Sequence, residues 1–194
     1  MEKESDAIIL SGTLPAHVPQ EIYCELLRGT EEKIVIIDTP GKPLLAALET
    51  RPTLVKINAE ELAKTLNTPS EVTRPTKSGT VGWVTSPGEI EEMAKELIAQ
   101  GAGAVGITQG PDSALLVTPN ETVQFSIPSV EVESTLGCGD SVNAGIAFSL
   151  RKGNPLTEAF VFGLACGAAN AQTAMPGVID PAAVATLASQ ITVQ

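Results

Sequence analysis

Short runs of β-branched and aliphatic residues recur along the chain and alternate with amphipathic segments. The run Lys33–Ile37 (KIVII) is continuous and β-branched, which is typical of a strand covered on both faces. Similar runs lie at Ala7–Leu10, Leu54–Ile57 and Ala104–Thr108. Strands of this kind need helices above and below their sheet. The alternation of strand and helix therefore predicts an α/β fold with a mainly parallel sheet.

The segments between these runs carry apolar residues at helical spacing. The predicted helices are Val18–Arg28, Gly41–Glu49, Ala59–Leu66, Glu89–Gln100, Asp140–Leu150, Pro155–Gln172 and Pro181–Gln190. Two further strands, Ala114–Val117 and Val123–Ile127, flank the turn sequence TPNE and predict an antiparallel hairpin at one edge of the sheet. Asn67–Pro87 is rich in Thr, Pro, Ser and Gly and is predicted to be an exposed loop.

Length and charge restrict the class of protein. The chain has 194 residues, of which 43% are hydrophobic, so we expect residues 1–194 to form a single domain around one core. The net charge of −11 disfavours nucleic acid as a partner, although backbone dipoles can still bind a small phosphorylated ligand. No apolar run reaches the roughly 18 residues of a membrane helix. The three widely spaced cysteines fit reduced thiols, and we therefore expect a cytoplasmic protein with no membrane partner.

The stretch Ser134–Leu150 (STLGCGDSVNAGIAFSL) places two glycines directly before a predicted helix. Gly137 and Gly139 lack a Cβ atom, so the backbone can turn sharply and a ligand can approach it closely. The unsatisfied N–H groups of the following helix point into the same turn, and the helix dipole adds about half a positive charge. Gly137, Cys138 and Gly139 are therefore predicted to form an anion site.

Asp140 follows this turn at once. A carboxylate beside an anion site repels the bound anion, so its presence there suggests a chemical role. The natural task is to take a proton from an incoming hydroxyl while the N–H groups hold a transferring phosphoryl group. The alternative is that Asp140 only caps the helix, since Asp is favoured at helix N-termini. The local pattern leaves both open.

Two further motifs follow predicted strands. In KINAEEL, Asn58 and Glu61 lie one turn apart at a helix start, where an amide and a carboxylate can orient a hydrated Mg²⁺, although Asn is also a common helix cap. In ITQGPDSALLVT, Thr108 and Gly110 lie at the end of a strand, where α/β sheets bind ligands. An ordinary turn has the same composition, so this second motif is weak by itself.

Together these stretches resemble the ribokinase-like, PfkB-type carbohydrate kinases, in particular the branch of 1-phosphofructokinase and tagatose-6-phosphate kinase. STLGCGDSVNAGIA resembles the family's C-terminal signature D-T-x-G-A-G-D, and KINAEEL resembles its K-P-N-x-x-E-L element. SGTLPAHVP is similar to S-G-S-L-P-x-G-V-P of the phosphosugar branch, and DTPGKPLLAAL to its D-x-S-G-x-x-L segment. The order and spacing of the motifs agree over nearly the whole chain.

The resemblance implies a ribokinase-like, three-layer αβα fold and a carbohydrate kinase activity. Such enzymes transfer the γ-phosphoryl group of ATP to a sugar hydroxyl with the help of Mg²⁺. The implied acceptor is a phosphorylated ketohexose: fructose 1-phosphate, fructose 6-phosphate or tagatose 6-phosphate. ATP, Mg²⁺ and a small phosphosugar are therefore the expected partners.

The resemblance also implies a role for individual residues, carried over by position. The catalytic set would be Asp140 as general base, with Gly137, Cys138 and Gly139 as the anion hole. Asn58 and Glu61 would arrange Mg²⁺ and the phosphates. The nucleotide site would be lined by Thr108 and Gly110, with Gly167 and Asn170 on its adenine side. Ser11 and Gly12 would lie near the sugar.

Four positions depart from the family pattern. Cys138 replaces the usual alanine and Ile57 replaces the proline of K-P-N. Ser134 stands where Asp or Asn is usual, and Ser113 where the nucleotide loop usually has Gly. Together these departures leave the affinity for ATP open.

Members of this family begin with further strands, a small β lid and sugar-binding motifs, whereas this chain starts at what resembles a mid-sheet strand, AIILSGTLP. We therefore expect the N-terminal strands and the lid to be missing. An exposed sheet edge would follow, and with it association of the chain with itself or through that edge. The first hypothesis is an ATP-dependent phosphosugar kinase, or its C-terminal part, whose activity without the sugar half stays open. The alternative is a non-catalytic nucleotide-binding or dimerising remnant of such a kinase.

Overall fold

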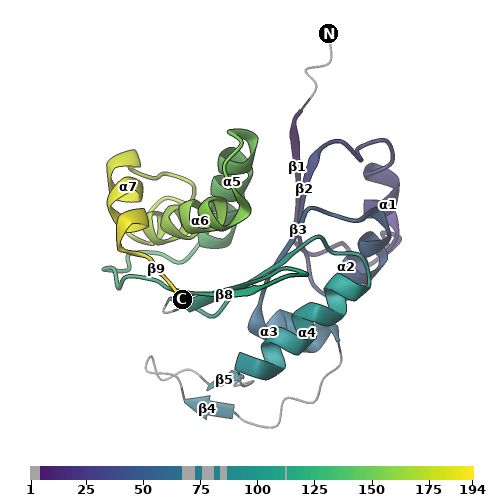
Figure 1. Ribbon diagram of the computed structural model, residues 1–194, viewed down its shortest axis with the longest axis horizontal. Coiled ribbons are helices and arrows are strands. Elements are labelled where there is room, and N and C mark those ends of the chain that lie inside the picture. The colour runs from purple at the N-terminus through teal and green to yellow at the C-terminus, as the bar shows by residue number, and fades with distance from the viewer. Residues whose placement is uncertain (1–4, 67–72, 76–80, 84–86, 112) are drawn as a thin grey trace.

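A seven-stranded mixed sheet forms the middle layer of the computed structural model, which describes residues 5–66, 73–75, 81–83, 87–111 and 113–194 (Figure 1). The strands follow one another across the sheet in the order β1-β2-β3-β6-β7-β8-β9. The first four are parallel: β1 (Ala7–Ser11), β2 (Ile34–Asp38), β3 (Leu54–Asn58) and β6 (Val105–Thr108). The last three run antiparallel to their neighbours: β7 (Ser113–Val117), β8 (Thr122–Ser126) and β9 (Thr192–Val193). The predicted parallel sheet and edge hairpin are confirmed.

Helices cover both faces of the sheet. One face carries α1 (Ile22–Leu26), α2 (Lys42–Ala47), the 3₁₀ helix η1 (Leu48–Thr50), α3 (Ala59–Thr65) and α4 (Pro87–Ala99). The other face carries α5 (Cys138–Arg151), α6 (Leu156–Ala171) and α7 (Pro181–Gln190). In β2, Ile37 packs into the core between the sheet and helices α1 to α4, and Ile36 into the core between the sheet and helices α5 to α7. Both side chains are fully buried. This two-sided burial explains why the strand sequence is continuously apolar.

Glycines allow α5 and α6 to approach closely. A Cβ atom at Gly145 of α5 would lie 2.9 Å from the Cα atom of Gly163 in α6. A Cβ atom at Gly163 would lie 2.5 Å from Cγ1 of Ile146 and 2.7 Å from the backbone oxygen of Val142. The backbone atom cannot move aside without shifting the helix. The start of α5, which carries the glycine motif, is therefore held against α6 by direct backbone packing.

Replacing Gly163 by Ala is expected to lower the free energy of unfolding by about 1–3 kcal/mol, because the added methyl group overpacks the contact between α5 and α6. Urea denaturation followed by circular dichroism measures the change. The matched control is Gly88→Ala near the start of α4, where a Cβ atom meets nothing within 4 Å. The control is expected to be neutral or slightly stabilising. Equal stability of the two variants would contradict the close packing.

The structure differs from the predicted elements at three places. Helix α1 begins at Ile22 rather than Val18, because the preceding residues form turns in which Val18 N bonds Pro15 O and Ile22 N bonds Pro19 O. Strands β4 (Thr73–Pro75) and β5 (Val81–Trp83) pair with each other inside the predicted loop Asn67–Pro87, and most of that loop lies outside the described residues. Strand β9 was not predicted, since two residues carry no periodic signal.

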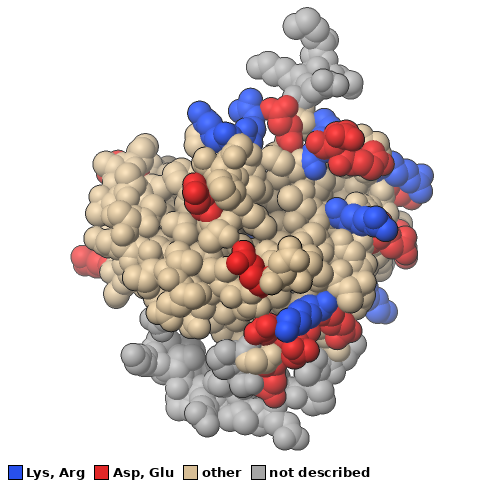
Figure 2. All heavy atoms as spheres, viewed as in Figure 1, with Lys and Arg blue, Asp and Glu red and all other residues tan. Residues whose placement is uncertain are grey.

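Strand β1 stands at one end of the sheet and pairs only with β2 among the described residues. Ile9 in this strand keeps 38% of its surface exposed. Figure 2 shows charged side chains on the side of the molecule where the N-terminal strands and α1 lie, over α4, and at the end of α5, while the surface over α6 and α7 is largely uncharged. Among the described residues, no helix combines the length and the apolar character that a membrane span requires. Association through the β1 edge stays a prediction.

Candidate functional site

The carboxyl ends of the four parallel strands meet at one edge of the sheet, and each ends in a polar residue. Ser11 ends β1, Asp38 ends β2, Asn58 ends β3 and Thr108 ends β6. Ser11 is directly opposite Asp38, and Asn58 directly opposite Thr108. Ligands of open α/β sheets bind at this edge. Three residues that the sequence analysis singled out, Ser11, Asn58 and Thr108, are thus aligned along it.

The glycine turn forms as predicted and leads into α5. Gly137 has a φ of 79°, a left-handed conformation that suits glycine, and α5 begins at Cys138. The first hydrogen bond into the helix runs from Ser141 N to Gly137 O at 2.9 Å. The amides of Gly139 and Asp140 precede this bond, so they have no partner within the helix. These two N–H groups are available to an anion.

Asp140 is exposed at the start of α5. Its Oδ1 accepts a hydrogen bond from Ser11 Oγ at 3.2 Å, across 129 residues of sequence. The adjoining Gly12 is tied to the end of β2, because its N–H donates to Asp38 O and its carbonyl accepts from Thr39 Oγ1. The residue predicted as a base and the residues predicted to lie near the sugar are therefore neighbours.

A buried ionic cluster lies beneath the glycine turn. The Lys56 ammonium is 3.0 Å from Asp38 Oδ2, and the side chains keep only 8% and 14% of their surface exposed. The same oxygen accepts a hydrogen bond of 2.5 Å from Asn143 Nδ2 in α5. A Cβ atom at Gly139 would lie 3.1 Å from Lys56 Nζ, so the absence of a side chain there makes room for the ammonium.

No role for Asp38, Lys56 or Asn143 was predicted from the sequence. A signal was present for Lys56, because a charged residue inside a strand that is covered on both faces requires a buried partner. Nothing in the sequence identifies that partner, because Asp38 lies 18 residues away on another strand. Asn143, which bonds the same carboxylate, lies 105 residues from Asp38. Asn143 Oδ1 is buried without a hydrogen-bond partner in the described structure.

Asn58 and Glu61 form a capping box at the start of α3. Asn58 Oδ1 accepts from Glu61 N at 2.8 Å, and Glu61 Oε2 accepts from Asn58 N at 3.3 Å. The capping role that the sequence left open is therefore real. Among the described residues, no group of three or more His, Cys, Asp or Glu side chains surrounds a metal position. A metal role for this pair stays a prediction.

Thr108 ends β6, and Gly110 lies in the turn that leads from β6 to β7. Gly110 has a φ of 77°, and a Cβ atom there would meet nothing within 4 Å, so its backbone borders open space. The turn is closed by a bond from Gln109 N to Ser113 O and by a bond from Ser113 Oγ to Gln109 Oε1. Ser113, which departs from the family pattern, thus helps to hold this turn.

Gly167 and Asn170 lie inside the protein on α6. A Cβ atom at Gly167 would be 2.6 Å from Val142 Cγ2 and 3.2 Å from Cys138 O, so this glycine serves the contact with the start of α5. Asn170 is completely buried, and its side chain bonds only other protein groups. Neither residue presents a side chain to a ligand. Their place on the adenine side of a nucleotide stays a prediction.

The three cysteines occupy different environments. Burial raises the pKa of Cys166 to about 11. Burial, with the nearby Glu49 carboxylate, also raises the pKa of Cys24, whose thiol donates to Ala46 O. Cys138 is half-buried within the glycine turn and accepts a hydrogen bond from Asn170 Nδ2 at 3.3 Å. Only Cys138 therefore lies next to the candidate anion site.

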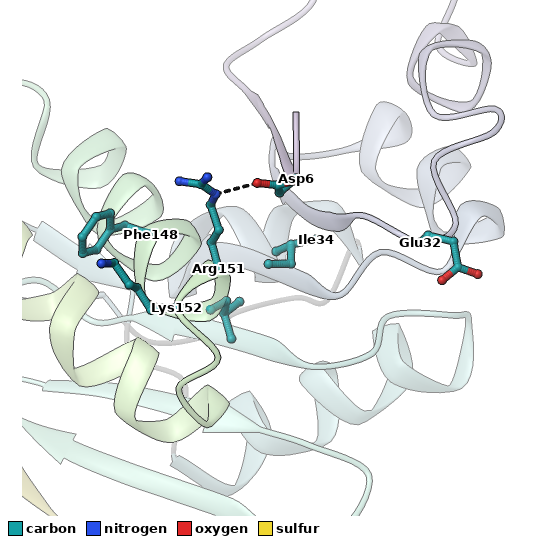
Figure 3. Close-up of a pocket in the computed structure, with 7 residues that line it drawn as sticks. Asp6, Glu32, Ile34, Phe148, Arg151 and Lys152 are labelled. Atoms are coloured by element: carbon teal, nitrogen blue, oxygen red, sulfur yellow. Dashed lines mark hydrogen bonds and ion pairs between the residues drawn. The ribbon is translucent and has the colours of Figure 1, made fainter. Parts of the chain in front are cut away.

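An open hollow of about 540 Å³ lies elsewhere on the molecule (Figure 3). Its lining comprises Asp6, Glu32, Ile34, Phe148, Leu150, Arg151 and Lys152, with an ion pair of 2.6 Å between Arg151 Nε and Asp6 Oδ2. Ile34 is the first residue of β2, and Arg151 is the last of α5. The hollow thus lies at the amino ends of the strands, opposite the edge that carries the candidate site.

Comparison with known proteins gives one consistent result. A family model described as "pfkB family carbohydrate kinase" matches residues 3–182. The 1-phosphofructokinase of Bacillus subtilis is 33% identical over 172 residues, which are 87% of this chain and 52% of that protein. The ATP-dependent 6-phosphofructokinase isozyme 2 of Escherichia coli is 32% identical over 174 residues, 87% of this chain and 52% of that protein. The chain thus spans about half the length of the curated relatives it matches.

Solved structures agree with these matches. The crystal structure of phosphofructokinase-2 from Escherichia coli in complex with potassium aligns with a TM-score of 0.79 at 26% identity, covering 95% of this chain and 56% of that chain. Ribokinase from Thermotoga maritima aligns with a TM-score of 0.70 at 21% identity, covering 95% of this chain and 57% of that chain. The ribokinase-like fold expected from the sequence is confirmed.

Proposed function

Since the chain belongs to the pfkB family of carbohydrate kinases, we propose that it carries the phosphoryl-transfer part of an ATP-dependent phosphosugar kinase. The observation that carries the proposal is the exposed Asp140 carboxylate, which lies at the free amides of the glycine turn and is hydrogen-bonded to Ser11 Oγ at 3.2 Å. A base and an anion site so close together suit a reaction in which a hydroxyl attacks a phosphoryl group.

In the proposed reaction, the acceptor oxygen of the sugar forms a bond to the γ-phosphorus as the bond from that phosphorus to ADP breaks. The electron pair of the broken bond leaves with ADP, and the hydroxyl proton moves to the Asp140 carboxylate. The hydrogen bond from Ser11 orients that carboxylate. The amides of Gly139 and Asp140 hold the charge of the phosphoryl group, and the Lys56 ammonium beside Gly139 adds positive charge that Asp38 partly offsets.

Asn58 and Glu61 fit a hydrated Mg²⁺ at the same edge. Their donor set is an amide oxygen and a carboxylate, which suits a hard cation that keeps several waters. The capping box uses Oε2 of Glu61 and one acceptor position of Asn58 Oδ1, and both groups have further acceptor capacity. A bound Mg²⁺ would neutralise phosphate charge, while the two residues orient its waters.

The acceptor that we propose first is fructose 1-phosphate, because the Bacillus subtilis relative is a 1-phosphofructokinase. Fructose 6-phosphate follows from the Escherichia coli relative, and tagatose 6-phosphate from the motifs of the phosphosugar branch. A second candidate function is a non-catalytic nucleotide-binding or dimerising part of such a kinase. It is the alternative that the sequence leaves open, and turnover decides between the two.

Nucleotide binding at the glycine turn is expected to protect Cys138 from alkylation. The protein is treated with iodoacetamide with and without ATP and Mg²⁺, and each modified cysteine is quantified by mass spectrometry. ATP should slow the reaction at Cys138 at least about tenfold, because a phosphate on the turn covers the thiol. Cys24 is the internal reference: it lies on α1, on the other face of the sheet, and its rate should not change.

Turnover separates the two candidate functions. ADP release is measured with each of the three sugar phosphates in turn. Protection of Cys138 together with ADP release on one sugar phosphate supports the kinase. Protection without ADP release on any of them supports the non-catalytic alternative. Equal alkylation of Cys138 with and without ATP would contradict the kinase and the nucleotide-binding alternative, and would leave only a dimerising part.

A further inference from the structure

One carboxamide connects three segments around the glycine turn. Asn170 on α6 is 0% exposed. Its Nδ2 donates to Leu136 O at 2.9 Å and to Cys138 Sγ at 3.3 Å. Its Oδ1 accepts from Gly177 N at 2.7 Å and from Ser141 Oγ at 3.3 Å. Both N–H donors and both acceptor positions are therefore used within the protein.

Two backbone groups define which way this amide faces. Leu136 offers a carbonyl, which only accepts, so Nδ2 must face it. Gly177 offers an N–H, which only donates, so Oδ1 must face that side. The orientation follows from fixed backbone chemistry, and no other side chain of that size supplies two donors and two acceptors in the same plane.

The bonds of Asn170 act where the turn has least support of its own. Helix α5 has no side-chain cap at Gly137, and a Cβ atom at Gly137 would lie 2.9 Å from Pro176 Cβ. The turn therefore rests on the loop that contains Pro176 and Gly177. Asn170 bonds the turn before Gly137, the first turn of α5 after it, and this loop. A shift of this loop would therefore also move the amides of Gly139 and Asp140.

We propose that Asn170 is a positioning residue: it holds the glycine turn and the 173–178 loop in one geometry, so that the amides of the turn meet the phosphoryl group. This inference rests on the proposed function. It assigns Asn170 an effect through the turn rather than through contact with the adenine. A misplacement of the amides by about 1 Å costs on the order of 100-fold in rate.

The test is Asn170→Asp, which keeps the shape of the side chain and replaces Nδ2 by an acceptor facing Leu136 O. We expect kcat at saturating ATP to fall about 10- to 100-fold. The ATP concentration that half-protects Cys138 should rise by at least about tenfold. The KM for the sugar phosphate should stay unchanged, because the sugar side at Ser11 does not contact Asn170. Protection is expressed as the ratio of the alkylation rates of Cys138 with and without ATP. A change in the intrinsic reactivity of the thiol in the variant therefore does not affect the comparison.

Asn170→Leu is the second variant, in case the buried carboxylate prevents folding. The control for the substitution itself is Asn154→Asp, an exposed residue just after α5, where Nδ2 donates to Ser149 Oγ at 2.9 Å. If Asn170 only stabilises the core, the variants melt at a lower temperature but keep the wild-type kcat and the wild-type protection of Cys138 below that temperature. This result would overturn the inference and leave the proposed function intact. A wild-type chain whose Cys138 is not protected by ATP overturns the proposed function, and the inference with it.

Discussion

Replacing Asp140 by Asn is expected to lower kcat about 10²- to 10⁴-fold, because the amide cannot take the proton of the sugar hydroxyl. The KM values should change little, since Asn has the size of Asp and its oxygen can still accept the hydrogen bond from Ser11. Stability should also change little, because Asp140 is exposed. The measurement is ADP release at saturating ATP and sugar phosphate, compared with the wild-type chain.

The matched control for this variant is Asp180→Asn. Asp180 also stands at a helix start, where it caps α7 by accepting from Ala182 N at 3.0 Å. Asn is as good a cap as Asp, so stability and kcat should both be retained. A kcat of Asp140→Asn equal to that of the control would show that Asp140 is not the base. The capping alternative that the local sequence left open is not seen in the structure, since α5 has no side-chain cap and the Asp140 carboxylate bonds Ser11.

Replacing Lys56 by Met is expected to lower the free energy of unfolding by about 3–5 kcal/mol, because it leaves the buried Asp38 carboxylate without its cation. The side chains of the pair keep only 8% and 14% of their surface exposed, so solvent cannot replace the ammonium. The hydrogen bond from Asn143 remains but does not compensate the charge. Urea denaturation of the variant and the wild-type chain gives the difference.

Two further variants show whether the loss arises from the unpaired charge. The double variant Asp38→Asn with Lys56→Met removes both charges and should recover part of the lost stability. Lys64→Met removes an exposed partner, in a pair whose side chains are 62% and 50% exposed, and should change stability by no more than about 0.5 kcal/mol. A double variant no more stable than Lys56→Met would contradict the explanation by charge.

The secondary structure followed closely from local sequence. The continuous apolar runs at β2, β3 and β6 correctly indicated burial on both faces, and the hairpin of β7 and β8 followed from its turn residues. The run at β1 predicted the strand but not its exposure, because β1 lies at an edge of the sheet and Ile9 stays partly exposed. Helix α7 runs from Pro181 to Gln190, as predicted. The pairing of β4 with β5 and the addition of β9 escaped prediction, because two- and three-residue strands depend on a neighbouring strand rather than on a pattern of their own.

The glycine turn and Asp140 could be recognised in the sequence because their chemistry is local: small residues, a helix start and an acid lie within four positions. Ser11, Asp38 and Lys56 are polar residues at or near strand ends, and the sequence could show that much. Their grouping depends on strand order and on the seating of α5, which joins residues 129 and 105 positions apart. Likewise, only the fold shows that Asn170 is buried and that its side chain holds the glycine turn from the interior of the protein. Such contacts arise from packing between distant segments, which no local pattern encodes.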